Sequence, residues 1–175
     1  MIKTDTFRSG CFWITGLSGS GKTTIAELLR NKLVIDGYSV ILLDGDILRK
    51  VFNSKAYSYE ERKTLGFQYS RLCKLLVSQG ISVVIGVIGL FHELHAWNRE
   101  NIPNYVEIFL DTPLDELKRR DIKGIYRNLE EGKIKNVTGI DIAAEFPLTP
   151  NIKIKWNEAK DAKATFDEVI LKLKI

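Results

Sequence analysis

The sequence has few cysteines and histidines, and their spacing argues against two common kinds of site. Only two of each occur among its 175 residues. Cys11 falls in a strand pattern and Cys73 in a helix pattern, without the paired spacing of zinc ligands or the context of a disulfide-bonded secreted protein. We therefore expect two buried free thiols. His92 and His95 stand three positions apart, but no further histidine or cysteine lies nearby to complete a metal site.

Long hydrophobic runs and blocks of one charge are also missing. The longest apolar run, residues 81–91, is too short to span a bilayer and is interrupted by Ser82, Gly86 and Gly89. Residues 1–6 lack the apolar core of a signal peptide, so we expect a cytoplasmic protein without membrane contact. The net charge of +4 suits anionic substrates, yet basic and acidic residues are interspersed, which argues against nucleic-acid binding.

What the sequence does contain is a phosphate-binding loop. Residues 16–23, G-L-S-G-S-G-K-T, fit the pattern G-x-x-x-x-G-K-[ST], between an apolar strand pattern at 11–15 and an amphipathic helix pattern that starts at Thr24. Glycines let several backbone N–H groups and the positive end of the helix point into one concavity, which suits a polyphosphate. The residues that we expect to hold the phosphates of ATP are Gly16, Ser18, Gly19, Ser20, Gly21, Lys22, Thr23 and Thr24.

Two side chains of this loop have separate tasks. Lys22 reaches the β- and γ-phosphates, and the hydroxyl of Thr23 is a ligand for Mg²⁺, an ion that prefers oxygen ligands and phosphates. The alternative is a glycine-rich turn that binds nothing, but the strand before the loop and the helix after it argue against that. The sequence therefore predicts a binding site for ATP and Mg²⁺.

Strand and helix patterns alternate along the rest of the chain. Further strands are predicted at 39–43, 81–88, 105–110 and 152–156, and further helices at 47–52, 58–79, 91–101, from 113 onward, and 162–173. This alternation predicts one domain, residues 1–175, with the α/β fold of a P-loop NTPase: a three-layer α/β/α sandwich around a mainly parallel sheet. Ligands of such sheets bind at the carboxyl ends of the strands.

The expected helix ends rest on capping patterns. Ser58 and Glu61 have the spacing of a capping box for the long helix, and Gly80 ends it. Pro113 fits the first position of the next helix, with Thr112 as its cap.

An acidic turn follows the second strand, at the same predicted edge of the sheet as the phosphate loop. It contains Asp44, Gly45 and Asp46. One carboxylate can hold Mg²⁺ or its waters while the other orients an acceptor hydroxyl and takes its proton during in-line phosphoryl transfer. We assign Asp46 as the base and Asp44 to the metal. The alternative is that Asp46 only caps the short helix that follows.

The segment 121–150 has three glycines, two prolines and many charges, without steady periodicity. We interpret it as a mobile lid. Cations on a closing segment can neutralise the charge that develops on the transferred phosphoryl group and can exclude water. Arg120 and Lys123 are the strongest candidates for this role.

The order and spacing of these motifs resemble the adenylylsulfate kinase (APS kinase) family over residues 10–157. Besides the phosphate loop, the shared motifs are L-D-G-D at 43–46 with Arg49, D-T-P-L at 111–114, R-D-x-K-G-x-Y at 120–126 and I-K-x-x-T-G-I-D at 134–141. The resemblance implies transfer of the ATP γ-phosphate to the 3′-hydroxyl of a nucleotide whose 5′-phosphate carries a further group. It also suggests a homodimer.

The resemblance implies roles for individual residues as well. Asp46 and Arg49 contact the acceptor, Tyr57 stacks on its base, and Lys123 and Thr138 close over it. Further acceptor positions are Arg62, Ile88, Gly89, His92 and Val137, and further ATP positions are Arg120 and Asn157.

The acceptor motifs depart from the family pattern. Residues 64–68 read T-L-G-F-Q where the family has E-N-I-R-R, so an asparagine and two arginines are missing. Gly89 replaces a serine that is phosphorylated or contacts phosphate, His92 replaces an arginine, and Val137 replaces a stacking phenylalanine. Because a hydrogen bond to a charged group contributes about 1.5–3 kcal/mol, losing several arginine contacts weakens adenylyl sulfate binding by orders of magnitude.

The sequence therefore predicts a phosphotransferase with an alcohol group as acceptor, but leaves that acceptor open. Cytidine diphosphoramidate, the substrate of some relatives within the family, is favoured by the altered motifs. Adenylyl sulfate and another small hydroxyl compound are alternatives. A nucleotide-binding regulatory module without catalysis is the alternative outside enzymes, and the intact Lys22, Thr23 and Asp46 argue against it.

Overall fold

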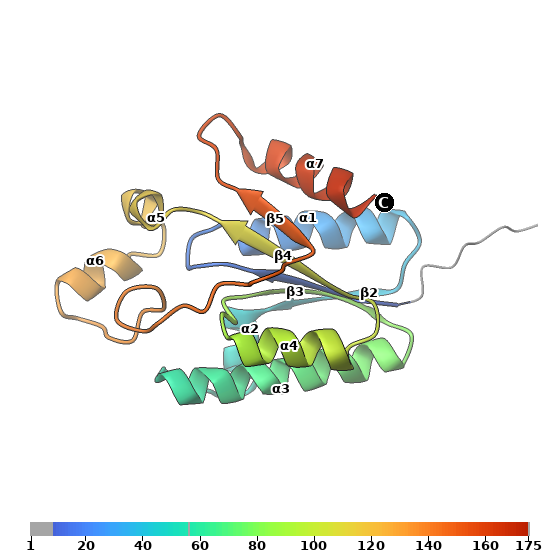
Figure 1. Ribbon diagram of the computed structural model, residues 1–175, viewed down its shortest axis with the longest axis horizontal. Helices are drawn as coiled ribbons and strands as arrows, with labels where there is room; N and C mark the ends of the chain where they lie inside the picture. The colour runs from blue at the N-terminus through green and yellow to red at the C-terminus, as the bar shows by residue number, and fades with distance from the viewer. Residues whose placement is uncertain (1–8, 56, 175) are drawn as a thin grey trace, which may run out of the picture.

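One parallel sheet forms the centre of the fold, and its strands are the apolar segments of the sequence. The computed structural model describes residues 9–55 and 57–174. Within them, five strands lie in the order β2-β3-β1-β4-β5, and each neighbouring pair is parallel (Figure 1). The strands are β1 (Cys11–Thr15), β2 (Val40–Asp44), β3 (Ser82–Val87), β4 (Tyr105–Asp111) and β5 (Ile152–Lys155).

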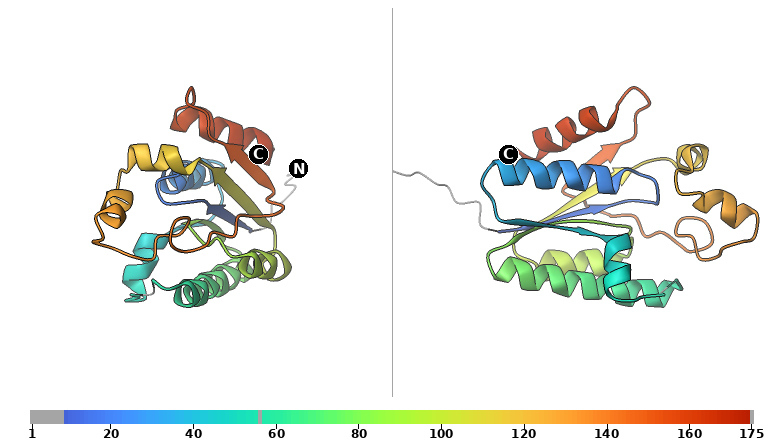
Figure 2. Two further views of the ribbon diagram at one scale, coloured as in Figure 1. Left: turned by 60° about the vertical axis from the view of Figure 1, so that its left-hand side comes forward. Right: turned by 180° about the vertical axis from the view of Figure 1, so that it is seen from behind.

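Helices cover both faces of this sheet, so the predicted α/β/α sandwich is confirmed (Figures 1 and 2). One face carries α1 (Lys22–Ile35) and α7 (Ala162–Leu173), and the other carries α2 (Gly45–Val51), α3 (Tyr59–Ser78) and α4 (His92–Asn101). Two short helices, α5 (Leu114–Arg120) and α6 (Ile125–Glu130), lie beyond the carboxyl ends of the strands. Among the described residues, none of the helices combines the length and the apolar composition needed to traverse a bilayer.

Alternate side chains of β1 pack into two separate apolar cores. Cys11 and Trp13 pack with residues of α3 and α4, while Phe12 and Ile14 pack with residues of α1 and α7. All four are at most 1% exposed, and fully burying a large apolar side chain stabilises a fold by about 1.5–3 kcal/mol. Cys73 lies in the same core as Cys11, and both are free and buried, as the sequence predicts. β1 is therefore held rigidly, which fixes the start of the phosphate loop.

The N-terminus of the long helix α3 was predicted correctly, whereas the N-terminus of α2 was not. Ser58 and Glu61 form the expected capping box. Asp44, not Asp46, caps α2: its Oδ1 accepts hydrogen bonds from the N–H groups of Asp46 at 2.8 Å and Ile47 at 3.2 Å. The reason is that the helix begins at Gly45, so the capping position falls on the extended residue before it.

The helix after β4 also begins one residue later than predicted. Pro113 is extended, with φ −57° and ψ 142°, and occupies the capping position instead of the first helical position. Within the described residues, no side chain caps this helix, so the prediction for Thr112 was wrong.

The lid segment, residues 121–150, contains more secondary structure than its sequence indicates. It includes α6 and a parallel bridge between Thr138 and Ile142. The carboxylate of Asp121 accepts hydrogen bonds from the N–H groups of Tyr126 and Arg127, both at 3.0 Å, at the start of α6. A helix of six residues is too short to give a periodic signal, which explains why it was not predicted.

Candidate active site

The phosphate loop joins β1 to α1, and its backbone has a positive φ at Gly16, Gly19 and Gly21, which favours glycine there. Gly16 has φ +152°, and a Cβ there would lie 2.7 Å from the carbonyl oxygen of Leu110 and 2.7 Å from Oγ of Ser20. Gly21 has φ +91° and directly precedes α1. The loop therefore curls tightly around the N-terminus of a helix of 14 residues, where unpaired N–H groups favour an anion.

The position of Lys22 in this loop suits an anionic ligand. Nζ of Lys22 donates to the carbonyl oxygen of Leu17 at 2.7 Å. Burial, and then the positive charge of Lys123, lower the pKa of Lys22 to about 7. Oγ of Ser20 is buried without a hydrogen-bond partner among the described residues. Lys22 is a partly buried cation beside a helix N-terminus, which fits the phosphates of a nucleotide, and their negative charge would stabilise the charged form of Lys22.

Oxygen donors suited to Mg²⁺ lie next to this loop. Oγ1 of Thr23 donates to Oδ2 of Asp44 at 2.9 Å. Within the described part of the chain, no three or more histidine, cysteine or acidic side chains cluster as metal ligands. The oxygen atoms of Thr23 and Asp44 fit Mg²⁺ in the way common to nucleotide sites, where phosphate oxygens and water complete its coordination.

Asp46 and Lys123 meet although they are 77 positions apart in the sequence. Nζ of Lys123 donates to Oδ2 of Asp46 at 2.6 Å. This hydrogen bond, more than any other contact, lowers the pKa of the Asp46 carboxyl group, so Asp46 is ionised at neutral pH. An ionised carboxylate is the form that can accept a proton.

A cavity of about 950 Å³ joins these groups to the lid segment. That volume is near the upper end for small-molecule sites. The predicted site residues that line it are Ser18, Gly19, Gly21, Lys22, Thr23, Thr24, Asp44, Asp46, Arg49, Tyr57, Arg62, Ile88, Gly89, Lys123, Val137 and Thr138.

The far wall of the cavity is built around Tyr57. The guanidinium carbons of Arg49 and Arg62 lie 5.3 Å and 5.7 Å from the centre of its ring. Arg62 also donates from Nη2 to the carbonyl oxygen of Asn136 at 2.6 Å, which ties α3 to the lid segment. An aromatic ring beside two cations can stack on a base and bind an anionic group of the same ligand.

Five predicted residues do not line this cavity. Gly16 and Ser20 belong to the phosphate loop but lie behind its inner surface. Arg120 donates from Nε to Glu116 at 2.5 Å and lies over the ring of Trp156 at 5.9 Å. The side-chain oxygen of Asn157 accepts from the N–H group of Ala159 at 2.9 Å. These local contacts draw Arg120 and Asn157 away from the cavity. The fifth residue is His92.

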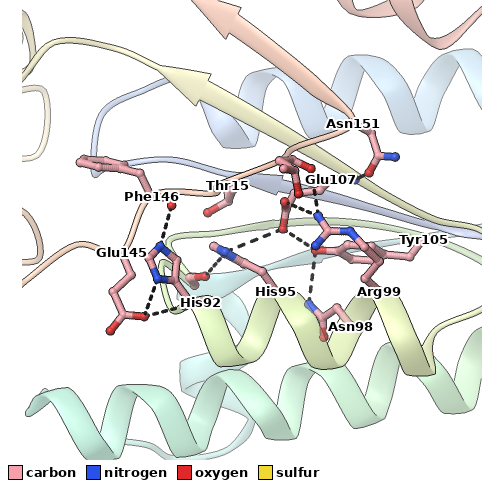
Figure 3. Close-up of polar contacts among 12 residues, drawn as sticks. Thr15, His92, His95, Asn98, Arg99, Tyr105, Glu107, Glu145, Phe146 and Asn151 are labelled. Atoms are coloured by element: carbon pink, nitrogen blue, oxygen red, sulfur yellow. Dashed lines mark hydrogen bonds and ion pairs between the residues drawn. The ribbon is translucent and has the colours of Figure 1, made fainter.

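His92 instead binds the far end of the lid segment (Figure 3). Its N–H group donates to Oε2 of Glu145 at 2.6 Å, and its Nε2 lies 2.9 Å from the carbonyl oxygen of Phe146. Glu145, which the sequence reading missed, also accepts from the hydroxyl of Tyr59 at 2.5 Å. These contacts explain why His92 is absent from the cavity wall.

The sequence reading also missed the apolar part of the cavity. Leu65, Gly66 and Tyr69 of α3 contribute to its wall, as do Trp13 and Phe91. These residues are also members of the apolar core or are buried against it. Apolar positions on one face of a helix read as core, so the sequence offered no signal that some of them also face a ligand.

A phosphate loop at the junction of β1 and α1, with an acidic turn after β2, defines a P-loop kinase. The family model for adenylylsulphate kinase matches residues 8–155, and the chain belongs to this family. It is accordingly a nucleotide kinase, a phosphotransferase with a hydroxyl group as acceptor and with ATP and Mg²⁺ as its cofactors.

Two curated relatives are equally similar to this chain but differ in substrate. An adenylyl-sulfate kinase of Microcystis aeruginosa is 38% identical over 148 residues, covering 82% of this chain and 80% of the relative. A cytidine diphosphoramidate kinase of Campylobacter jejuni is 38% identical over 135 residues, covering 77% and 79%. Among solved structures, the APS kinase of Mycobacterium tuberculosis in complex with AMPPNP and APS has a TM-score of 0.86 and 34% identity, covering 96% of this chain and 99% of that one.

Proposed function

We propose that this kinase phosphorylates the 3′-hydroxyl of a nucleotide whose 5′-phosphate carries a further group, and that this nucleotide is cytidine diphosphoramidate. The relatives leave the choice open, because both kinds are 38% identical to the chain. The proposal rests on the wall of the cavity formed by residues 64–68 of α3. Leu65 and Gly66 line the cavity there, and the ring of Phe67 packs against Trp97 at 6.1 Å. This stretch supplies no positive charge where the family pattern has two arginines.

On the donor side, the chain holds the triphosphate and its metal. The N–H groups of the phosphate loop and Lys22 bind the β- and γ-phosphates. Thr23 and Asp44 are the residues that would hold Mg²⁺, which neutralises phosphate charge when it is bound.

On the acceptor side, Asp46 takes the proton of the 3′-hydroxyl. The hydroxyl oxygen forms a bond to the γ-phosphorus, the bond from that phosphorus to the β–γ bridging oxygen breaks, and ADP leaves. Arg49, Tyr57 and Arg62 hold the base and phosphates of the acceptor. Without the acceptor, Nζ of Lys123 donates a hydrogen bond to Asp46. When the acceptor binds, its hydroxyl replaces Lys123 as the donor, and Lys123 is then free to face the transferred phosphoryl group.

We further propose that residues 121–150 act as the lid of a single domain. Thr138 and Val137 lie in this segment and line the cavity, and Arg62 binds its backbone. Closure over both nucleotides would exclude water from the phosphoryl group, which otherwise competes as an acceptor.

The acceptor is tested by measuring kcat/KM for cytidine diphosphoramidate and adenylyl sulfate side by side. We expect a clear preference for cytidine diphosphoramidate. A strong preference for adenylyl sulfate would overturn the proposed acceptor and leave the kinase assignment intact.

A matched variant sharpens this comparison. Val137→Phe restores the ring of the family pattern, and we expect it to shift the ratio of the two kcat/KM values toward adenylyl sulfate by about tenfold, because stacking on one base contributes about 1–3 kcal/mol. Val137→Ile enlarges the side chain without adding a ring and should leave the ratio within about twofold. Equal ratios in both variants would show that Val137 does not contact the base.

Two further expectations belong to the proposal. The homodimer implied by the family can be tested by sedimentation of the purified protein. A cytoplasmic location can be tested by fractionating cells that express it.

A further inference from the structure

The loop after β3, residues 88–91, is held by separate parts of the fold. Gly89 in this loop has φ +46°, and a Cβ there would lie 3.0 Å from the ring of Trp13. The carbonyl oxygen before Gly89 accepts a hydrogen bond from Oγ1 of Thr15 on β1, and the carbonyl oxygen after it accepts one from the N–H group of Glu145 at 3.1 Å. The loop lines the acceptor side of the cavity, so its position affects what fits there.

The carbonyl oxygen of Gly89 itself is bound by a buried histidine. Nε2 of His95 on α4 lies 2.7 Å from this oxygen, and the N–H group of Phe91 donates to the same oxygen at 3.1 Å. A carbonyl oxygen only accepts, so Nε2 must carry the proton. His95 is 3% exposed, and burial lowers its pKa, which keeps the ring neutral at pH 7. Its Nδ1 is then unprotonated.

A buried carboxylate stands behind this histidine (Figure 3). Oε1 of Glu107 lies 3.9 Å from Nδ1 of His95, which has no hydrogen-bond partner among the described residues. Glu107 is fully buried and is anchored by Nη2 of Arg99 and the hydroxyl of Tyr105, both at 3.0 Å. Its N–H group donates to Oδ1 of Asn151 at 2.8 Å. The ring of His95 therefore lies between the carbonyl of Gly89 and a carboxylate that is itself held by hydrogen bonds.

We propose that His95 is a positioning residue for the acceptor nucleotide: its Nε2–H group holds the carbonyl of Gly89 and thereby sets where the loop meets the acceptor. This inference rests on the proposed function in one respect, because it takes the acceptor to bind against residues 88–91. Gly89 carries no side chain, so at this position the loop presents only backbone atoms to the cavity, and their position affects the fit. The phosphate loop lies outside this set of contacts, so ATP binding does not depend on it.

Kinetics of two variants test this role. His95→Phe keeps the size of the ring but loses the donor, and His95→Gln places an amide nitrogen near the position of Nε2. With whichever of the two named nucleotides the wild type turns over faster, we expect His95→Phe to raise the KM of the acceptor about tenfold while the KM of ATP stays within about twofold, since a carbonyl oxygen loses its partner. His95→Gln should restore the KM of the acceptor to within about threefold of wild type. An unchanged acceptor KM in His95→Phe, or an equal rise of both KM values, would overturn the proposal.

A second measurement needs neither turnover nor the correct acceptor. The chain has only two histidines, so ¹⁵N NMR of the ligand-free protein resolves both imidazoles, and His92→Gln assigns them. We expect His95 as the Nε2–H tautomer at pH 7. The Nδ1–H tautomer would contradict the hydrogen bond to Gly89, because its Nε2 carries no proton to donate. If neither named nucleotide is phosphorylated but the tautomer is as expected, the fault lies with the proposed acceptor, not with the position of His95.

Discussion

Nζ of Lys123 lies 2.6 Å from Oδ2 of Asp46, so a cation of the lid segment binds the carboxylate assigned as the base. The contact keeps Asp46 ionised by lowering its pKa. In the proposed function the acceptor hydroxyl takes the place of Lys123, so binding of the acceptor is linked to movement of Lys123.

The first prediction concerns Asp46 as the base. Asp46→Asn keeps the size of the side chain but cannot take a proton, and we expect kcat to fall about 10²- to 10⁴-fold, with ATP affinity within a few-fold of wild type. ADP release in the presence of acceptor measures kcat, and fluorescence titration with an ATP analogue measures affinity.

The matched control is Asp167→Asn on α7, whose carboxylate forms a surface ion pair with Lys163. Its kcat should equal that of wild type. Undiminished turnover by Asp46→Asn would show that the base is another group. A wild-type protein that binds ATP but consumes none with any candidate acceptor would favour the regulatory module over the enzyme.

The second prediction concerns the pH profile of the Lys123–Asp46 pair. Lys123→Gln removes the charge that lowers the pKa of Asp46, so this pKa rises, and the acid limb of the kcat/KM profile moves to higher pH. The two side chains are 50% and 67% exposed, so the free energy of unfolding should change by less than about 1 kcal/mol. Lys118→Gln, which breaks an ion pair with Glu130, is the control and should leave the profile in place.

The third prediction concerns Lys22 and stability. In the ligand-free folded protein its pKa is lowered from 10.5 to about 7, so between these values the unfolded chain binds more protons than the folded one. The free energy of unfolding should therefore rise as the pH increases above 7. Lys22→Met lacks this contribution, so its stability should rise less over pH 7–9, and it should fold normally but transfer no phosphate.

Urea unfolding at several pH values, with and without an ATP analogue, measures this effect. Bound phosphates raise the pKa of Lys22 and should flatten the wild-type dependence. Lys50→Met, at an exposed position of α2, is the control and should follow wild type. If Lys22→Met were unfolded without nucleotide, Lys22 would have a structural role instead.

The fourth prediction concerns the buried carboxylate of Glu107. Glu107→Gln puts an amide group against the donors of Arg99 and Tyr105, and we expect the free energy of unfolding to fall by about 2–3 kcal/mol. Glu93→Gln removes an exposed pair with Lys63 and should cost less than about 1 kcal/mol. Equal losses in urea unfolding would mean that the buried network contributes no more than a surface pair.

Local patterns in the sequence predicted much of the fold correctly. The burial of β3 and the limits of α7 follow from apolar periodicity within one segment, and the capping box at Ser58 follows from a spacing of three residues. The first residues of helices were predicted less well, because a shift of one or two residues moves the capping position, as at Asp44 and Pro113. The helix α6 gave no periodic signal at all, since it has only six residues.

The candidate site also has a part that the sequence predicted and a part that it did not. The sequence by itself located the phosphate loop, because the loop is contiguous and its glycines, Lys22 and Thr23 lie within a single strand-loop-helix unit. It did not place Arg120 and Asn157, which were predicted at the ATP site but do not line the cavity. Only the tertiary structure decided the acceptor half. There, Asp46 forms an ion pair with Lys123, His92 contacts Glu145 instead of lining the cavity, and Nε2 of His95 contacts the carbonyl oxygen of Gly89. These groups come from segments that meet only once the parallel sheet brings the carboxyl ends of its strands to one edge, and no periodicity within any one segment records which of them will be neighbours.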